Sequence, residues 1–354
     1  MAKINAAVES IVKSLQAKFG EENITYLGNN KAVAIERISS GSFSLDNALG
    51  GGWPVGRIIE VVGENSSGKT TLCYHAMAEA QKLGWVVGLV DTEYSHDPIY
   101  SGNIGVDNNS LIVSQPEDGT QALDILIQML DAGVRLVVVD SVASLLPREE
   151  AESDDFGKAT VGRQAQLMSK ALRKLTPVVG RNKAIVMFTN QFRQKIGVLY
   201  GDPQISAGGE SLKYYASIRC RVSTISGSTD TAKRTKVKVI KNKTAVPFKE
   251  TEFNIIFGVG IDKINDIVEG AIDSGLFQKG AGGVYTSKIL SDRGVEKIRG
   301  REKLLTWIKE QGEDFLKFLS KEAKEYVENQ RNNPDNQNSS QEEDDEQNSS
   351  SGEI

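Results

Sequence analysis

Cysteine and histidine are scarce in this sequence, and their scarcity excludes several classes of protein. Only Cys73 and Cys220 occur among 354 residues, so a disulfide scaffold is excluded and no cysteine pair has metal-binding spacing. There are two histidines, His75 and His96, which is too few for a histidine-rich metal site. A Ser-His-Asp triad also has few histidines to draw on. No apolar run approaches the roughly 18–20 residues that span a bilayer, and the first residues lack the apolar region of a secretion signal. We therefore expect a cytoplasmic protein that does not bind membranes.

The net charge of −5 is distributed unevenly along the chain. Residues 331–354 carry a net charge of −6, whereas residues 1–330 carry +1. The acidic segment consists mainly of Asn, Gln, Ser, Glu and Asp and has too few apolar residues to form a core. We therefore interpret residues 329–354 as a disordered acidic tail. It either keeps the protein soluble or competes with nucleic acid for basic surfaces.

Apolar strands alternate with amphipathic helices through the middle of the chain. The pattern predicts strands at 58–62, 85–90, 136–140 and 184–188, and helices at 68–83, 119–132 and 161–179. Continuous apolar strands separated by helices indicate a mostly parallel sheet that helices cover on both faces. Residues 214–257 are rich in strands. The chain is therefore predicted to be an α/β protein with one main domain, at 31–262.

Two smaller parts flank this main domain. Apolar residues recur at three- and four-residue steps over residues 3–19, which predicts an amphipathic helix that ends at Gly20. We expect residues 1–30 to form an arm that packs on the protein's own core or on a neighbouring subunit. From about residue 263 the pattern changes to a small α/β unit, which ends in a helix near 314–329. We therefore expect a small C-terminal domain at 263–328.

Residues 63–70 match the phosphate-binding pattern G-x4-G-K-S/T. The pattern follows a buried strand and opens a helix, which is the context that it requires. Its backbone N–H groups and the helix N-terminus would point at an anion. Lys69 is expected to reach the β- and γ-phosphates of ATP, and Thr70 is expected to bind Mg²⁺. The predicted nucleotide contacts in this segment are Gly63, Glu64, Asn65, Ser66, Ser67, Gly68, Lys69, Thr70 and Thr71.

Three further strands end in polar residues that suit an ATPase. The strand at 136–140 ends in Asp140, which could hold Mg²⁺ through water. Glu93 follows the strand at 85–90 and is a candidate to activate the attacking water, although a surface glutamate in a turn is the simpler interpretation. Gln191 follows the strand at 184–188 and could sense the γ-phosphate or simply cap the strand.

Taken in order, these motifs resemble the bacterial RecA family of homologous-recombination ATPases. The resemblance runs from about residue 3 to residue 328. It is carried by residues 63–71, 91–93, 97–100, 137–141, 190–193, 208–209, 212–219 and 241–248. It implies a P-loop NTPase core of RecA type that uses ATP and Mg²⁺, forms a helical filament on single-stranded DNA and hydrolyses ATP when DNA is bound. It also implies homologous pairing with duplex DNA, strand exchange and a co-protease role in the SOS response. A LexA-type repressor and loading or regulatory proteins would be its partners.

The resemblance also assigns roles to individual residues. Glu93 would activate water, Gln191 would couple the γ-phosphate to a DNA loop, and Asp97 and Tyr100 would hold adenine. Lys241 and Lys243 would reach the ATP of the neighbouring subunit, so that activity would require assembly.

Two loops, at about 153–163 and 192–207, would hold DNA according to the resemblance. Val161 and Ile196 would lie between base triplets, while Arg173, Arg193 and Lys195 would contact phosphates. Gly208 and Gly209 would allow the backbone to approach closely. The second loop could also be an ordinary connection with an apolar tip.

Basic residues gather between 233 and 243, where Lys236, Lys238 and Lys241 would share one face of a strand. The resemblance implies that Lys236 and Lys238 help to capture duplex DNA; a solvated face is the simpler interpretation.

The sequence also departs from the family. Glu64-Asn65 stands where the family usually has Pro-Glu, Gln166 where it has arginine, and Ser223-Thr224 where it has a basic pair. These changes spare the ATPase residues but weaken the case for duplex capture, so a divergent copy is one interpretation. Two alternatives use the same predicted core. One is a ring-forming motor such as a helicase, and the other is a nucleotide-gated DNA-binding scaffold. A metabolic phosphotransferase is disfavoured because no acceptor-site motif is found.

Overall fold

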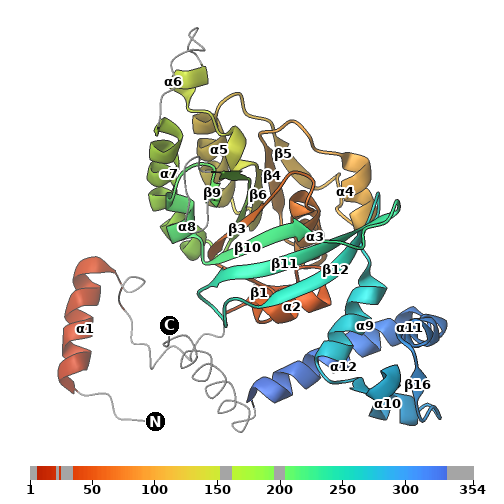
Figure 1. Ribbon diagram of the computed structural model, residues 1–354. Coiled ribbons are helices and arrows are strands. Elements are labelled where there is room, and N and C mark those ends of the chain that lie inside the picture. Colours follow the sequence, from red (N-terminus) through yellow and green to blue (C-terminus); the bar gives the residue numbers. More distant parts are fainter. Residues whose placement is uncertain (1–5, 21–23, 25–34, 152–161, 195–203, 333–354) are drawn as a thin grey trace, which may run out of the picture. The chain divides into compact units, whose positions relative to one another are not determined.

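The computed structural model describes residues 6–20, 24, 35–151, 162–194 and 204–332. The chain divides into two units, Met1–Glu36 and Arg37–Ile354, and we describe each by itself. Within the described residues, the second unit contains a nine-stranded sheet of order β13-β12-β11-β10-β3-β7-β6-β4-β5 (Figure 1). The predicted α/β fold with a mostly parallel central sheet is confirmed, and the chain contains the predicted phosphate loop between β3 and α3.

The parallel part of the sheet positions the polar strand ends at one edge. Its strands are β3 (Arg57–Gly63), β4 (Val87–Asp91), β5 (Leu111–Ser114), β6 (Leu136–Asp140), β7 (Ile185–Asn190) and β10 (Ile218–Thr224). Antiparallel pairing then adds β11 (Ala232–Asn242), β12 (Glu250–Ile256) and β13 (Gly260–Ile261). Because parallel strands end at a common edge, the residues after β3, β4, β6 and β7 come close together there.

Helices cover both faces of this sheet. One face packs against α2 (Phe43–Leu49), α3 (Lys69–Lys82) and α4 (Pro98–Ile104), and the other packs against α5 (Gly119–Asp131), α7 (Arg163–Arg181) and α8 (Ser211–Tyr215). The apolar run of β6 supplies both cores, since Leu136 and Val138 point to the first and Val137 and Val139 to the second. Short elements complete the unit: β1 (Arg37–Ile38), β2 (Trp53–Pro54), η1 (Val142–Ser144), α6 (Arg148–Ala151), β8 (Phe192–Gln194) and β9 (Gln204–Ser206).

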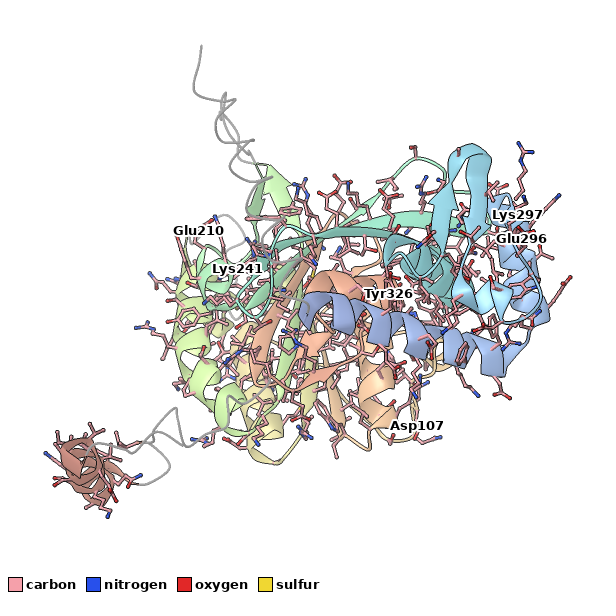
Figure 2. All side chains as sticks on the ribbon, turned by 90° about the horizontal axis from the view of Figure 1, so that it is seen from below. Asp107, Glu210, Lys241, Glu296, Lys297 and Tyr326 are labelled. Carbon is pink, nitrogen blue, oxygen red and sulfur yellow. The ribbon has the colours of Figure 1, made fainter. Side chains whose placement is uncertain are left out.

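A third core forms after residue 263. Its elements are α9 (Lys263–Asp273), β14 (Gln278–Gly280), η2 (Ala281–Gly283), β15 (Val284–Thr286), α10 (Lys288–Ser291), β16 (Ile298–Arg299), α11 (Arg301–Glu310) and α12 (Glu313–Asn332). Figure 2 shows Glu296 and Lys297 on the segment before β16. The buried carboxylate of Asp266 on α9 accepts hydrogen bonds from Phe43 N at 2.5 Å and Ser42 Oγ at 3.0 Å. This contact attaches the third core to the start of α2.

The first unit contains the helix α1 (Ala6–Phe19). Its apolar residues Val8, Ile11, Leu15 and Phe19 are exposed, as expected for an arm that offers an apolar stripe. None of the helices in the described ranges combines the length and hydropathy needed to cross a bilayer.

Element boundaries differ from the predicted ones where turns intervene. The strand predicted at 85–90 begins at Val87, because Trp85 N donates to Ala80 O and closes the end of α3. The helix predicted at 161–179 begins at Arg163, because Gly162 has a left-handed backbone with φ of 95°.

Candidate nucleotide-binding and catalytic site

The phosphate loop joins the end of β3 to the start of α3, and its glycines are required by close packing. A Cβ on Gly63 would lie 2.2 Å from the carbonyl oxygen of Val222, and Gly68 has φ of 109°. Ser67 Oγ is buried and has no hydrogen-bond partner among the residues described. An unpaired buried hydroxyl beside the N-terminus of a 14-residue helix suits an anionic ligand, so the loop fits a phosphate chain.

Lys69 lies folded against this loop. Its Nζ donates to Glu64 O at 2.7 Å and to Gly63 O at 3.2 Å, and burial lowers the pKa of its ammonium group. The side chains of Glu64 and Asn65 are exposed and do not line the nucleotide cavity described below. Lys69 is thus a desolvated cation whose hydrogen bonds to the described residues go to neutral carbonyl groups, for which a phosphate oxygen would be a stronger partner.

Thr70 and Asp140, the two residues expected to hold Mg²⁺, are in direct contact. Thr70 Oγ1 donates to Asp140 Oδ2 at 2.8 Å, and Thr189 Oγ1 donates to Asp140 Oδ1 at 2.5 Å. Burial raises the pKa of the Asp140 carboxyl, while these hydrogen bonds act in the opposite direction. In the described ranges, no three or more His, Cys, Asp or Glu side chains are arranged so that they could together hold a metal ion. A hydroxyl and one carboxylate fit Mg²⁺, which keeps several waters and takes its remaining ligands from phosphates.

Glu93 lies between Ser141 and Gln191. Ser141 Oγ donates to Glu93 Oε1 at 2.5 Å, and Gln191 Nε2 donates to the same oxygen at 3.4 Å. The backbone before Glu93 is tied to the neighbouring strand, because Thr92 N and Glu93 N both donate to Asp140 O. Glu93 therefore lies in a turn whose backbone is hydrogen-bonded to β6, at the shared edge of the sheet. Its carboxylate contacts Ser141 and Gln191.

A cavity of about 360 Å³ adjoins the phosphate loop. Asp97 and Tyr100, the residues expected to hold adenine, line it together with Thr71. Asp97 Oδ1 accepts from the backbone N–H groups of Ile99 and Tyr100 and so caps α4, while Tyr100 Oη lies 2.8 Å from Thr71 Oγ1. Among the described residues, the cavity is lined by Ser66, Ser67, Gly68, Lys69, Thr70, Thr71, Asp97, Tyr100, Lys233, Ile255, Phe257 and Gly258.

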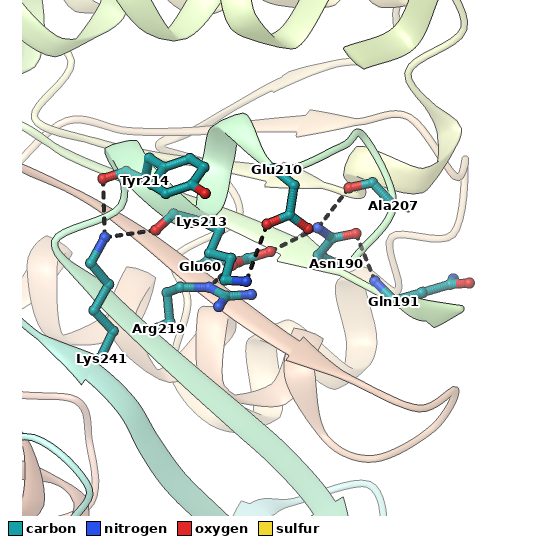
Figure 3. Close-up of polar contacts among 9 residues, drawn as sticks. All are labelled: Glu60, Asn190, Gln191, Ala207, Glu210, Lys213, Tyr214, Arg219 and Lys241. Carbon is teal, nitrogen blue, oxygen red and sulfur yellow. Dashed lines mark hydrogen bonds and ion pairs between the residues drawn. The ribbon is translucent and has the colours of Figure 1, made fainter. Parts of the chain in front are cut away.

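Gln191 connects this site to the second expected DNA loop. Ala207 N donates to Gln191 O, and Asn190 Nδ2 donates to Ala207 O at 3.1 Å and to Glu60 Oε1 at 2.8 Å (Figure 3). Strands β8 and β9 pair next to these contacts and form the base of a hairpin, which the sequence did not predict. The loop thus leaves the sheet at the residue that reaches Glu93.

Lys241 and Lys243 do not line the nucleotide cavity within the described residues. Lys241 Nζ donates to Lys213 O at 2.6 Å and to Tyr214 O at 3.0 Å (Figure 3). Lys243 Nζ donates to Tyr214 O at 3.3 Å. Burial, with the charges of Lys243 and Arg219, lowers the pKa of Lys241 to about 8. Both lysines therefore bond carbonyl groups of α8 rather than groups of the phosphate loop.

A β-bulge places the basic residues of β11. The register with β10 shifts between Arg219 and Cys220, so that Lys241 pairs with Arg219 and Lys238 pairs with Arg221. Lys236, Lys238 and Lys241 therefore share one face despite their uneven spacing. On that face Lys236 and Lys238 both form ion pairs with Glu250, the second at 2.8 Å.

The other residues expected to bind DNA are described only in part. Arg173 is exposed on α7 and donates to Ser169 O at 3.2 Å. Gly208 and Gly209 have positive φ, and side chains there would collide with Val142 and Ala165. Val161, Lys195 and Ile196 lie outside the described residues, as does most of both loops, and only the backbone of Arg193 is described.

Several polar residues of the site escaped the sequence analysis. They are Ser141 and Thr189, which position Glu93 and Asp140, and the buried ion pair of Glu60 with Arg219. Glu60 did leave a signal, since it is the single charge within the apolar run 58–62. Lys233 was grouped with the basic patch, yet its side chain lines the nucleotide cavity.

Comparison with known proteins agrees with this arrangement. Residues 6–262 match the sequence profile of the RecA N-terminal domain. The chain is 45% identical over 318 residues to Protein RecA of Chlorobaculum parvum, which covers 88% of each chain. It is 43% identical over 327 residues to Protein RecA of Trichodesmium erythraeum, covering 91% of this chain and 88% of the relative. Protein RecA of Arthrospira platensis is 45% identical over 310 residues, covering 86% of this chain and 83% of the relative.

Proposed function

The chain belongs to the RecA family, and from this premise we propose that it is an ATP-dependent recombinase. It assembles into a helical filament on single-stranded DNA, hydrolyses ATP in response to that DNA and promotes homologous pairing and strand exchange with a duplex. The observation that carries the proposal is the contact of Gln191 with Glu93, at the point where the second DNA loop leaves the sheet.

In this proposal the chain's own residues prepare the triphosphate for attack. The phosphate loop donates its N–H groups, and Lys69 exchanges its carbonyl partners for β- and γ-phosphate oxygens. Thr70 and Asp140 hold Mg²⁺, which when bound neutralises charge on these phosphates. Glu93 orients the attacking water and accepts its proton, while Ser141 keeps the carboxylate in place. Asp97 and Tyr100 position the adenine beside Thr71.

Gln191 and the two interface lysines make hydrolysis depend on DNA and on assembly. A γ-phosphate that draws Gln191 toward itself would shift Ala207 and the β8–β9 hairpin, to which Gln191 is bonded. Lys241 and Lys243 supply positive charge to the ATP of the adjacent subunit. The exposed apolar stripe of α1 supports a role for residues 1–30 in polymerisation, with a second copy of the chain as its partner.

The DNA is held by the two loops at about 153–163 and 192–207. Val161 and Ile196 separate base triplets, and Arg173, Arg193 and Lys195 neutralise phosphates. Lys236 and Lys238 receive the duplex, and their shared partner Glu250 must release them first. The membership in the family further supports a cytoplasmic protein with an SOS co-protease role, for which a LexA-type repressor and loading proteins are the partners.

The proposal is tested by measuring ATP hydrolysis with and without single-stranded DNA, together with electron microscopy. We expect DNA to stimulate hydrolysis and filaments to appear with ATP and DNA. Glu93→Gln should abolish the stimulated rate and leave filament formation intact. Glu117→Gln is the matched control, because Glu117 is an exposed carboxylate just after β5. Turnover that ignores DNA, or a Glu93→Gln protein with the normal stimulated rate, would contradict the proposal.

A further inference from the structure

Lys233 lies on the opposite face of β11 from the other lysines of the basic segment. Strand β11 alternates, so its odd-numbered residues up to Val239 point to one side and its even-numbered residues to the other. Thr235 and Val237 on the odd side are buried, whereas Lys236 and Lys238 on the even side meet Glu250. Lys233 is on the odd side, and it is the member of this segment that lines the nucleotide cavity within the described residues.

The odd side of β11 packs over the phosphate loop. A Cβ on Gly68 would lie 2.6 Å from Ile255 Cδ1 and 3.9 Å from Thr235 Cγ2. Ile255 pairs with Lys233 across the sheet. The Nζ of Lys233 donates to the carbonyl oxygen of Ser66 and lies 5.8 Å from the centre of the Phe257 ring. Lys233 therefore reaches the phosphate loop from the side opposite to Asp140.

The charge of Lys233 has no anionic partner at this position among the described contacts. It is held by a neutral carbonyl group, and burial lowers its pKa. The ammonium group of Lys69 is held by the same loop, since its Nζ donates to Gly63 O and Glu64 O. Two ammonium groups thus flank one loop and repel each other, an arrangement that a bound polyanion would stabilise.

We infer that Lys233 is an additional phosphate-binding residue of the nucleotide site. When a nucleotide enters, Lys233 exchanges the Ser66 carbonyl for a phosphate oxygen, and it thereby favours polyphosphates over uncharged nucleosides. The inference rests on the proposed function, since it adds a residue to the same ATP site. A long side chain with three donors can make this exchange without moving the strand, and charge-assisted hydrogen bonds are stronger than those to a carbonyl.

The decisive experiment measures ligand affinity without DNA. Dissociation constants of ATP, ADP, adenosine and tripolyphosphate are determined by calorimetry, with Mg²⁺, for the wild type and three variants. Lys233→Ala should weaken ATP, ADP and tripolyphosphate about tenfold and leave adenosine unchanged. Lys233→Arg should restore most of the affinity. The loss should shrink at high salt, because screening weakens a partly exposed charge contact.

Arg234→Ala is the matched control, because it removes a positive charge from the same strand on the opposite face, where Arg234 pairs with Glu252. It should leave all four affinities unchanged. If Lys233→Ala weakened the affinities for adenosine and ATP equally, Lys233 would only stabilise the conformation of the phosphate loop. That result would overturn the inference. Unchanged ATP and tripolyphosphate affinities would overturn it as well.

The same data separate this inference from the proposed function. If the wild type binds tripolyphosphate but not ATP, the proposed function fails, and the effect of Lys233→Ala on tripolyphosphate decides the inference by itself. If the wild type binds neither, both fail. Thermal unfolding without ligand identifies a misfolded variant, and in that event Lys233→Gln replaces Lys233→Ala with the same expectations.

Discussion

Glu60 and Arg219 form an ion pair between neighbouring strands inside the central sheet. Their side chains are 0% and 9% exposed, and the two residues pair directly in the register of β3 with β10. The other oxygen of Glu60 accepts from Asn190, whose amide also binds Ala207 (Figure 3). The pair therefore supports the peptide segment on which Gln191 stands, at a distance from the nucleotide itself.

Breaking this ion pair should destabilise the protein strongly. Arg219→Leu leaves the Glu60 carboxylate buried without its cation, which typically costs about 3–5 kcal/mol. Replacing both residues by leucine should cost less than the single change, because no uncompensated charge remains. Urea unfolding of the two variants measures the difference.

The surface pair of Arg234 with Glu252 is the matched control, since it also joins neighbouring strands. Its side chains are 48% and 38% exposed, so Arg234→Ala should cost less than about 1 kcal/mol. An equally mild effect of Arg219→Leu would contradict the buried ion pair described above.

Ser141 should affect turnover rather than nucleotide binding. Its hydroxyl donates a hydrogen bond to Glu93 Oε1 at 2.5 Å, and Ser141 directly follows Asp140 in the sequence. Ser141→Ala should lower kcat about tenfold and leave KM for ATP nearly unchanged, since it orients the water-activating carboxylate without touching the nucleotide. Ser141→Thr should restore much of kcat. Steady-state hydrolysis with DNA tests this, and the exposed Ser144→Ala serves as the control. A rise in KM at constant kcat would show that Ser141 acts on binding instead.

His75 should make the fold sensitive to mild acid. The imidazole is 1% exposed, its Nε2 accepts from Ile261 N at 3.0 Å, and burial lowers its pKa to about 3, assisted by the charges of Lys263 and Lys82. The unfolded chain takes up a proton near pH 6.5, whereas the folded chain does not. Stability from this group is therefore complete above about pH 6.5 and falls as the pH is lowered toward 3. The loss at pH 5 is about 2 kcal/mol.

The comparison with His75→Gln isolates this contribution. Glutamine can still accept from Ile261 N but does not titrate, so the difference in unfolding free energy between wild type and variant should change by about 2 kcal/mol between pH 7 and pH 5. The pH dependence of the wild-type unfolding free energy does not isolate His75, because burial raises the pKa of Asp266 to about 6. Protonation of Asp266 makes the folded state more stable as the pH falls, whereas His75 makes it less stable. A difference independent of pH would show that His75 takes up its proton equally in the folded and unfolded chains, and the effect of burial on its pKa would be refuted.

Filament assembly should take up a proton near pH 8.5. Lys241 has a pKa of about 8 in the single chain, so at that pH most molecules carry a neutral amine. If assembly brings Lys241 to a neighbouring triphosphate, the anion raises its pKa and the amine binds a proton. Calorimetry in two buffers of different ionisation enthalpy, with a non-hydrolysable ATP analogue and DNA, should detect at most about three-quarters of a proton per subunit at pH 8.5 and far less at pH 7.

The Lys236→Ala protein should show the same uptake, because Lys236 lies with Glu250 rather than with Tyr214. Equal uptake at both pH values would argue against Lys241 as the group that meets the phosphates.

Local patterns in the sequence were sufficient for the fold class and for part of the site. The apolar runs ending in Asp140 and Asn190 predict parallel strands, because only strands buried on both faces are apolar throughout. The glycines and Lys69 of the phosphate loop follow from a contiguous motif. Asp140, Glu93 and Gln191 could be placed together from sequence alone because parallel strands end at a common edge.

Only the tertiary structure decided which residues from distant segments meet. The face on which Lys241 lies depends on a bulge that spacing did not predict, and the position of Lys233 depends on how β11 packs over the phosphate loop. The partnership of Glu60 with Arg219 and Asn190 joins three strands. Periodicity reports which side of its own element a residue occupies, whereas pairing across strands is set by register and packing over the whole sheet. For this reason the sequence alone determined the chemistry available at the sheet edge, and the packed fold determined its supports and its additional cation.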